Sequence, residues 1–134
     1  MGTRIVRSSV AMLLLAGMLA GQDRLDTLIQ ATYKGQWTGA AGGGDIHITF
    51  RDAGDGKLTP EVGFTLEGQD VVCKVLSFKT DGTKFIMVYE FDTQGGRLQS
   101  ATEARVRGKT IEGTYKTTAG DQAVDAGTWK ATAP

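Results

Sequence analysis

Large apolar side chains recur at every second residue in one central stretch, Lys84-Phe85-Ile86-Met87-Val88-Tyr89-Glu90-Phe91. Phe85, Met87, Tyr89 and Phe91 therefore share one face if this stretch is a β-strand, since successive side chains point to opposite faces. The same period of two continues on both sides of this stretch, in residues 46–51, 61–66, 102–107, 111–116 and 127–132. One apolar face per strand is typical of an antiparallel sheet that encloses a core.

Turn signals separate these strands at intervals of about 12–14 residues. Each contains glycine, which tolerates the positive φ that tight hairpins require. They are Gly42-Gly43-Gly44, Asp55-Gly56, Gly68-Gln69-Asp70, Asp81-Gly82, Gly95-Gly96, Gly108-Lys109 and Gly120-Asp121. Seven turns separate eight strands, and no helical stretch between them is long enough for a parallel crossover. The sequence therefore predicts an all-β protein, an eight-stranded antiparallel up-and-down β-barrel.

A short motif of glycine followed two residues later by an aromatic residue recurs near both ends of this region. It occurs as Gly35-Gln36-Trp37-Thr38 in the first strand, Gly113-Thr114-Tyr115-Lys116 in the seventh and Gly127-Thr128-Trp129-Lys130 in the eighth. In a closed meander the first and last strands pair, so Trp37 and Trp129 should lie side by side near Tyr115. We interpret Trp37 and Trp129 as a structural aromatic cluster, with an aromatic ligand cage as the alternative.

The N-terminal residues have a different character. Arg4 and Arg7 precede an apolar run over residues 10–20, which is the length of a secretory signal core and too short to span a bilayer. We therefore expect residues 1–21 to be a signal peptide and the protein to be exported, to the periplasm or the extracellular space. The alternative is a buried N-terminal helix. Residues 22–134 form a single domain in this reading, with a short helix over residues 24–32 before the barrel and no membrane span.

Composition argues against several classes of function. The 134 residues carry 15 basic and 15 acidic side chains, so no broad basic face for nucleic acid is expected. Cys73 is the single cysteine, which excludes an intramolecular disulfide and a multi-cysteine zinc site. His47 is the single histidine and falls on the polar face of its strand, where solvent contact is expected. No catalytic residue, metal or cofactor is predicted.

Taken together, the Gly35-Gln36-Trp37 opening, the eight-stranded meander and the export signal resemble the calycin superfamily of lipocalins and avidins, over about residues 30–132. The chain also resembles small secreted bacterial barrels of unassigned activity, through Ile111-Glu112-Gly113-Thr114-Tyr115 and the Gly127-Thr128-Trp129 ending. For calycins the resemblance implies binding of a small, largely apolar molecule inside the barrel.

We therefore expect a non-catalytic protein that binds a small hydrophobic or amphipathic ligand in its lumen, although a core filled by side chains is the alternative. The expected ligand-binding residues are Phe64, Met87, Tyr89, Ser100, Thr102 and Tyr115. A second hypothesis is a structural or interaction module that forms a homo-oligomer or binds a partner through an outward apolar patch. That patch comprises Leu76, Phe78, Ile86 and Val88. A more distant alternative is a cofactor-free isomerase or cyclase.

Overall fold

The computed structural model describes residues 31–40, 42–52, 54 and 57–134, and all regular structure in them is β-strand. The strands are β1 (Thr32–Gly39), β2 (Gly42–Asp52), β3 (Leu58–Leu66), β4 (Gln69–Val72), β5 (Lys74–Asp81), β6 (Lys84–Thr93), β7 (Gly96–Arg107), β8 (Thr110–Ala119) and β9 (Gln122–Thr132). The predicted signal peptide and residues 24–30 of the predicted helix lie outside the described residues. The end of that helix was predicted wrongly, since Thr32 begins β1.

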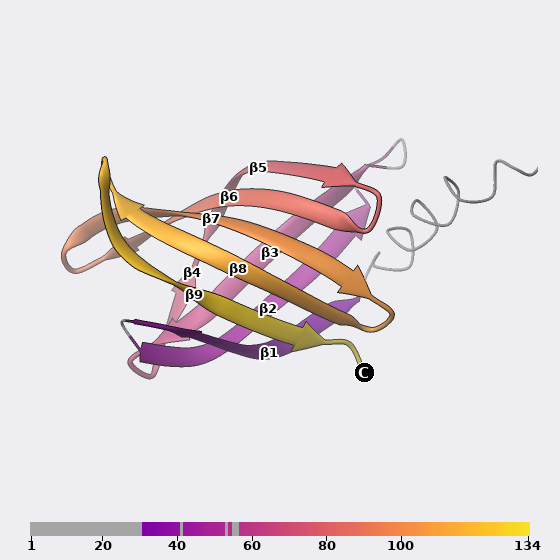
Figure 1. The fold of residues 1–134 in the computed structure, drawn as a ribbon, viewed down its shortest axis with the longest axis horizontal. Helices are drawn as coiled ribbons and strands as arrows, with labels where there is room; N and C mark the ends of the chain where they lie inside the picture. Colours follow the sequence, from indigo (N-terminus) through magenta and orange to yellow (C-terminus); the bar gives the residue numbers. More distant parts are fainter. Residues whose placement is uncertain (1–30, 41, 53, 55–56) are drawn as a thin grey trace, which may run out of the picture.

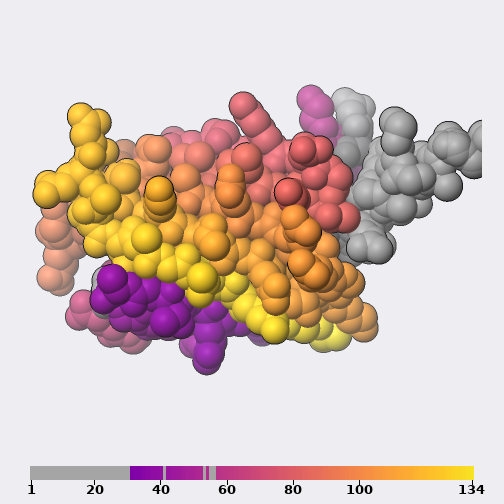
Figure 2. Space-filling view, viewed as in Figure 1, coloured from indigo at the N-terminus to yellow at the C-terminus, as the bar shows by residue number. Residues whose placement is uncertain are grey.

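All nine strands belong to one antiparallel sheet in the order β4-β3-β2-β1-β9-β8-β7-β6-β5, which curls round an interior (Figure 1). The predicted pairing of the first and last strands is confirmed, because β1 and β9 are hydrogen-bonded with Trp37 opposite Trp129. In the space-filling view the indigo β1 lies directly against the yellow β9 (Figure 2).

The predicted eight-stranded closed barrel is wrong, because the sheet has nine strands and stays open between its two ends, β4 and β5. The expected fourth strand is divided at Cys73 into β4, which pairs with β3, and β5, which pairs with β6. β4 leaves β3 after four paired residues, so the first part of β3 has no strand partner on that side. The backbones of β3 and β5 approach within 8 Å, but no ladder joins them in the described part of the chain. The result is a curled nine-stranded sheet with two unpaired edges.

The predicted outward patch is also corrected at one position. The register of β5 on β6 shifts between Val75 and Ser77, which leaves Leu76 as an extra, bulged residue. A one-residue shift exchanges the two faces of a strand. Phe78 therefore points into the core, with its ring centroid 5.3 Å from that of Phe85, while Leu76 and Ile86 stay about half exposed. The apolar surface is thus smaller than the sequence predicts.

Large side chains fill the end of the interior that lies at the β5–β6 and β7–β8 hairpins. Phe50 is fully buried there and contacts the rings of Tyr33, Phe78 and Phe85 at centroid distances of 5.8–6.0 Å. Ile48, Val106 and Ile111 are also buried and complete this packing. No space for a ligand is expected where bulky residues interdigitate in this way.

Each tryptophan crosses a glycine of the neighbouring strand to reach the strand beyond. The Trp129 indole lies on Gly113, where an added Cβ would stand only 2.5 Å from Nε1, and donates to Thr102 Oγ1 at 2.7 Å. The Trp37 indole passes Gly44 in the same way and donates to the carbonyl oxygen of Thr65 at 3.0 Å. Glycine is required because any side chain would occupy the space of the ring.

Candidate functional site

The opposite end of the interior is hollow. A cavity of about 230 Å³ lies there, toward the β1–β2, β3–β4, β6–β7 and β8–β9 hairpins. Its lining consists mainly of apolar and aromatic side chains. They are Trp37, Ile46, Phe64, Leu66, Tyr89, Phe91, Leu98, Ser100, Tyr115, Thr117, Val124, Asp125 and Trp129. Concave, mostly apolar spaces with few polar groups are typical of small-molecule sites.

Five aromatic rings form a continuous belt round this cavity. The order of contact is Tyr115, Trp37, Phe64, Phe91 and Tyr89, with successive centroids 6.1, 6.0, 4.9 and 6.3 Å apart. The first three contacts are edge-to-face, the arrangement that aromatic quadrupoles favour. The belt therefore draws its rings from β1, β3, β6 and β8 and holds its shape through ring-to-ring packing.

Side chains with hydroxyl groups form the part of the cavity wall between Tyr89 and Tyr115. Tyr89 hydrogen-bonds with Ser100, and the Ser100 and Thr117 hydroxyl oxygens are 2.6 Å apart. Both short side chains are almost completely buried, so their mutual hydrogen bond satisfies groups that water does not reach. Since each hydroxyl has more hydrogen-bonding capacity than one bond uses, this part of the wall can also receive a polar ligand atom.

One carboxylate stands at the mouth of the cavity. The Tyr115 hydroxyl donates to Asp125 Oδ2 at 2.8 Å, and Gly39 leaves room for this pair because a Cβ there would meet the Tyr115 oxygen. Asp125 is opposite Thr117 and shares the inward face of β9 with Gly127 and Trp129, and a bulge lies next to it, where Thr118 is opposite Ala123. Val124 is the extra residue and is half exposed beside the opening. The bulge thus adds Val124 beside a carboxylate that the regular alternation of β9 already directs inward.

The structure brings four of the six predicted ligand-binding residues to the cavity wall, namely Phe64, Tyr89, Ser100 and Tyr115. Met87 and Thr102 are fully buried and do not line it. The Thr102 hydroxyl accepts a hydrogen bond from Trp129 and donates one to the carbonyl oxygen of Thr114 at 2.6 Å. Its role is therefore structural. Sequence reasoning missed Val124, because no residue pattern marks the bulge, and it missed Asp125, although the period of two through Trp129 and Gly127 extends to this residue. It favoured a structural role for Trp37 and Trp129 over an aromatic ligand cage, and both residues line the cavity.

The tyrosines at the cavity remain protonated at neutral pH. Burial, and then the hydrogen bond and charge of Asp125, raise the pKa of Tyr115. Burial is also the main cause of the raised pKa of Tyr89, to which nearby Cys73 adds. The pKa of the Cys73 thiol is itself raised by burial to about 12. These groups therefore act as neutral hydrogen-bonding side chains rather than as a general base or thiolate nucleophile.

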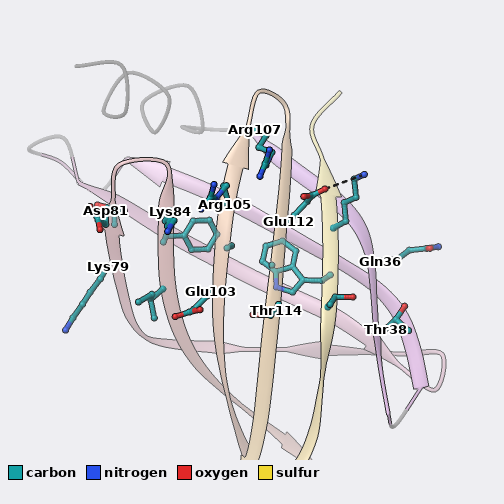
Figure 3. Close-up of a pocket in the computed structure, with 18 residues that line it drawn as sticks. Gln36, Thr38, Lys79, Asp81, Lys84, Glu103, Arg105, Arg107, Glu112 and Thr114 are labelled. Carbon is teal, nitrogen blue, oxygen red and sulfur yellow. Dashed lines mark ion pairs between the residues drawn. The ribbon is translucent and has the colours of Figure 1, made fainter. Parts of the chain in front are cut away.

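A larger hollow of about 940 Å³ lies on the outer face of β5–β9 and β1, and it has a different chemistry (Figure 3). Five basic and three acidic side chains line it: Lys79, Lys84, Arg105, Arg107 and Lys130, with Asp81, Glu103 and Glu112. Lys130 forms an ion pair with Glu112 at 3.7 Å, and Lys84 is flanked by Asp81 and Arg105 in the cross-strand register. Mixed charges of this kind are typical of a solvated sheet face. The interior cavity is therefore the stronger candidate site.

Other candidate groups stay apart from the cavity. His47 is exposed on β2, as predicted, and packs over Gly63. No group of three or more His, Cys, Asp or Glu side chains in the described ranges is placed to hold a metal ion. The described residues also contain no helix of the length and apolarity needed to cross a membrane.

Family models, curated proteins and solved structures were compared with the chain, and none matches it. These comparisons do not support the resemblance to calycins, which stays a prediction.

Proposed function

We propose that this protein binds one small, largely apolar molecule in the cavity at the open end of its curled sheet. The observation that carries the proposal is the belt of five aromatic rings round an interior space of about 230 Å³. A solid core would have closed this space, as Phe50 and its neighbours close the other end.

The volume of the cavity limits the size of the ligand. An apolar cavity of about 150 Å³ holds one benzene molecule, and pockets for drug-sized ligands begin at about 300 Å³. The cavity here lies between these values. We therefore infer a ligand with one ring, or a short branched chain, and a short tail.

The wall also indicates an amphipathic ligand. Ser100 and Thr117 form the polar part of an otherwise apolar wall, and Tyr115 with Asp125 forms a second polar part at the mouth. A molecule with an apolar body and one polar end satisfies both kinds of surface. The protein needs no catalytic group for this role.

The two tryptophans provide a direct test, because they are the only ones in the chain and both line the cavity. We would titrate the full chain with 3-phenylpropan-1-ol and follow the two indole N–H signals by NMR. Both signals should shift saturably, with a dissociation constant of about 0.1 mM for a ligand of this size. Glycerol, which has hydroxyl groups but no apolar body, is the control and should cause no saturable shift. The absence of saturable shifts with 3-phenylpropan-1-ol would contradict the proposal.

A further inference from the structure

We infer that the cavity selects cationic ligands, namely compact amines with an apolar body, over neutral and anionic molecules of the same shape. This inference rests on the proposed function, since it names the class of ligand that the same cavity would take. Its basis is the juxtaposition of an aromatic belt with a single carboxylate.

Charge in the lining has one sign. Of the thirteen residues that line the cavity, Asp125 is the one with a charged side chain, and no Lys, Arg or His is among them. The basic side chains of β6–β9 that line the outer hollow belong to the opposite face of the sheet. A positive ligand group at the mouth therefore meets a negative charge, and a carboxylate ligand would be repelled.

Aromatic rings supply the second attraction. Six aromatic residues line the cavity, and the negative faces of such rings attract ammonium groups within about 6 Å. Tyr115 and Trp37 contact each other beside Asp125, at a centroid distance of 6.1 Å. An ammonium group at this place would lie against both the rings and the carboxylate.

The Tyr115–Asp125 hydrogen bond is compatible with this role. Asp125 accepts from Tyr115 through Oδ2 and has a further interaction besides this bond, and a carboxylate has about four lone-pair sites in all. The bond keeps the carboxylate directed at the rim of the cavity. Side-chain carboxylates held in this way can accept a further, charge-assisted hydrogen bond from an amine.

Three probes of matched shape separate the inference from the proposed function: 3-phenylpropylamine, 3-phenylpropan-1-ol and 3-phenylpropionate. We expect the amine to bind the full chain about tenfold more tightly than the alcohol, and the carboxylate about tenfold more weakly than the alcohol. Dissociation constants would be measured from the two indole N–H signals at pH 7.

Charge at Asp125 is then tested with Asp125→Asn, which keeps an acceptor for Tyr115 but removes the negative charge. The preference for the amine over the alcohol should fall to about twofold or less, while binding of the alcohol is retained. Asp121→Asn is the matched control, because it removes a nearby negative charge from an exposed residue outside the lining. It should preserve the tenfold preference.

The outcomes are distinguishable. If the alcohol binds wild-type protein as tightly as the amine, or if Asp125→Asn retains the full preference, the inference is overturned and the proposed function stands. If none of the three probes binds, the proposed function fails together with the inference. Unchanged indole signals of ligand-free Asp125→Asn establish that the variant is folded.

Discussion

Trp37 and Trp129 stand opposite each other on β1 and β9, and their indoles reach in opposite directions round the interior. Trp37 donates to Thr65 on β3, and Trp129 donates to Thr102 on β7. Each ring therefore ties its own strand to the second strand away, so two side chains connect six adjacent strands. The pair holds the middle of the curled sheet while also forming part of the cavity wall.

Thr102→Val tests this connection on one side. The change keeps the size of the side chain but leaves the buried Trp129 N–H without its acceptor and removes the bond to the Thr114 carbonyl. The free energy of unfolding should fall by about 2 kcal/mol, since an unsatisfied buried donor is costly. Urea denaturation followed by tryptophan fluorescence measures the loss. Thr114→Val is the matched control on the exposed face, where the expected change is below about 0.5 kcal/mol. Equal effects would show that the hydrogen bond contributes nothing.

Gly113→Ala tests the space beneath the Trp129 ring. An added Cβ would stand 2.5–2.8 Å from three atoms of the indole, so the ring must leave its place. We expect a loss of about 2–3 kcal/mol in stability and a changed chemical shift of the indole N–H. Gly95→Ala is the control, because its Cβ would meet a single atom, the Thr93 hydroxyl, at 3.8 Å. Wild-type stability in Gly113→Ala would mean that the ring is not confined by this glycine.

Val124→Phe tests access to the cavity. Val124 is half exposed at the mouth, so a larger ring can cover the opening without entering the packed core. Binding of 3-phenylpropan-1-ol should weaken about tenfold, while the urea midpoint changes little. Ala101→Phe adds the same ring on the exposed face of β7 and should leave binding unchanged. Equal binding by both variants would place the ligand somewhere other than this cavity.

Stability should decrease at alkaline pH. The pKa values of Cys73, Tyr33, Tyr89 and Tyr115 are raised in the folded protein, above all by burial. Above about pH 8.5 for the thiol and pH 10 for the phenols, the unfolded chain loses protons that the folded chain retains. These four groups therefore leave the free energy of unfolding unchanged at neutral pH and lower it progressively as the pH rises toward 12.

Urea midpoints between pH 7 and 11 would measure this fall, and Cys73→Ala shows which part belongs to the thiol. In that variant the decrease should begin nearer pH 10, because only the tyrosines remain. A midpoint that is independent of pH up to 11 would contradict the burial of these groups.

Much of the fold was accessible from the sequence because a half-buried strand has a period of two. The alternation in residues 84–91 and the glycine turns locate the strands, and the repeated Gly-x-Trp motif predicts the pairing of Trp37 with Trp129. Four cavity residues followed from the same alternation, since inward positions on adjacent strands converge on one interior.

The remaining features depend on changes of a single residue. Four of the five residues in Val71-Val72-Cys73-Lys74-Val75 are apolar, so the change of partner strand at Cys73 leaves no signal in the pattern. The bulges at Leu76 and Val124 each shift the register by one residue. Such a shift exchanges the inward and outward faces, which turned Phe78 inward in β5, while in β9 the extra residue Val124 was added beside the cavity.

The unpaired edges of β3 and β5 have a mechanical consequence. Every other pair of adjacent strands in the described sheet is joined by a hydrogen-bonded ladder, so enlarging the interior there would break backbone bonds. Moving β5 away from β3 breaks none, and Cys73 is the single residue between β4 and β5 about which such a movement turns. The molecule thus has one side on which two strands are held together by side chains alone, through the contacts of Phe78 with Phe50 and Phe85.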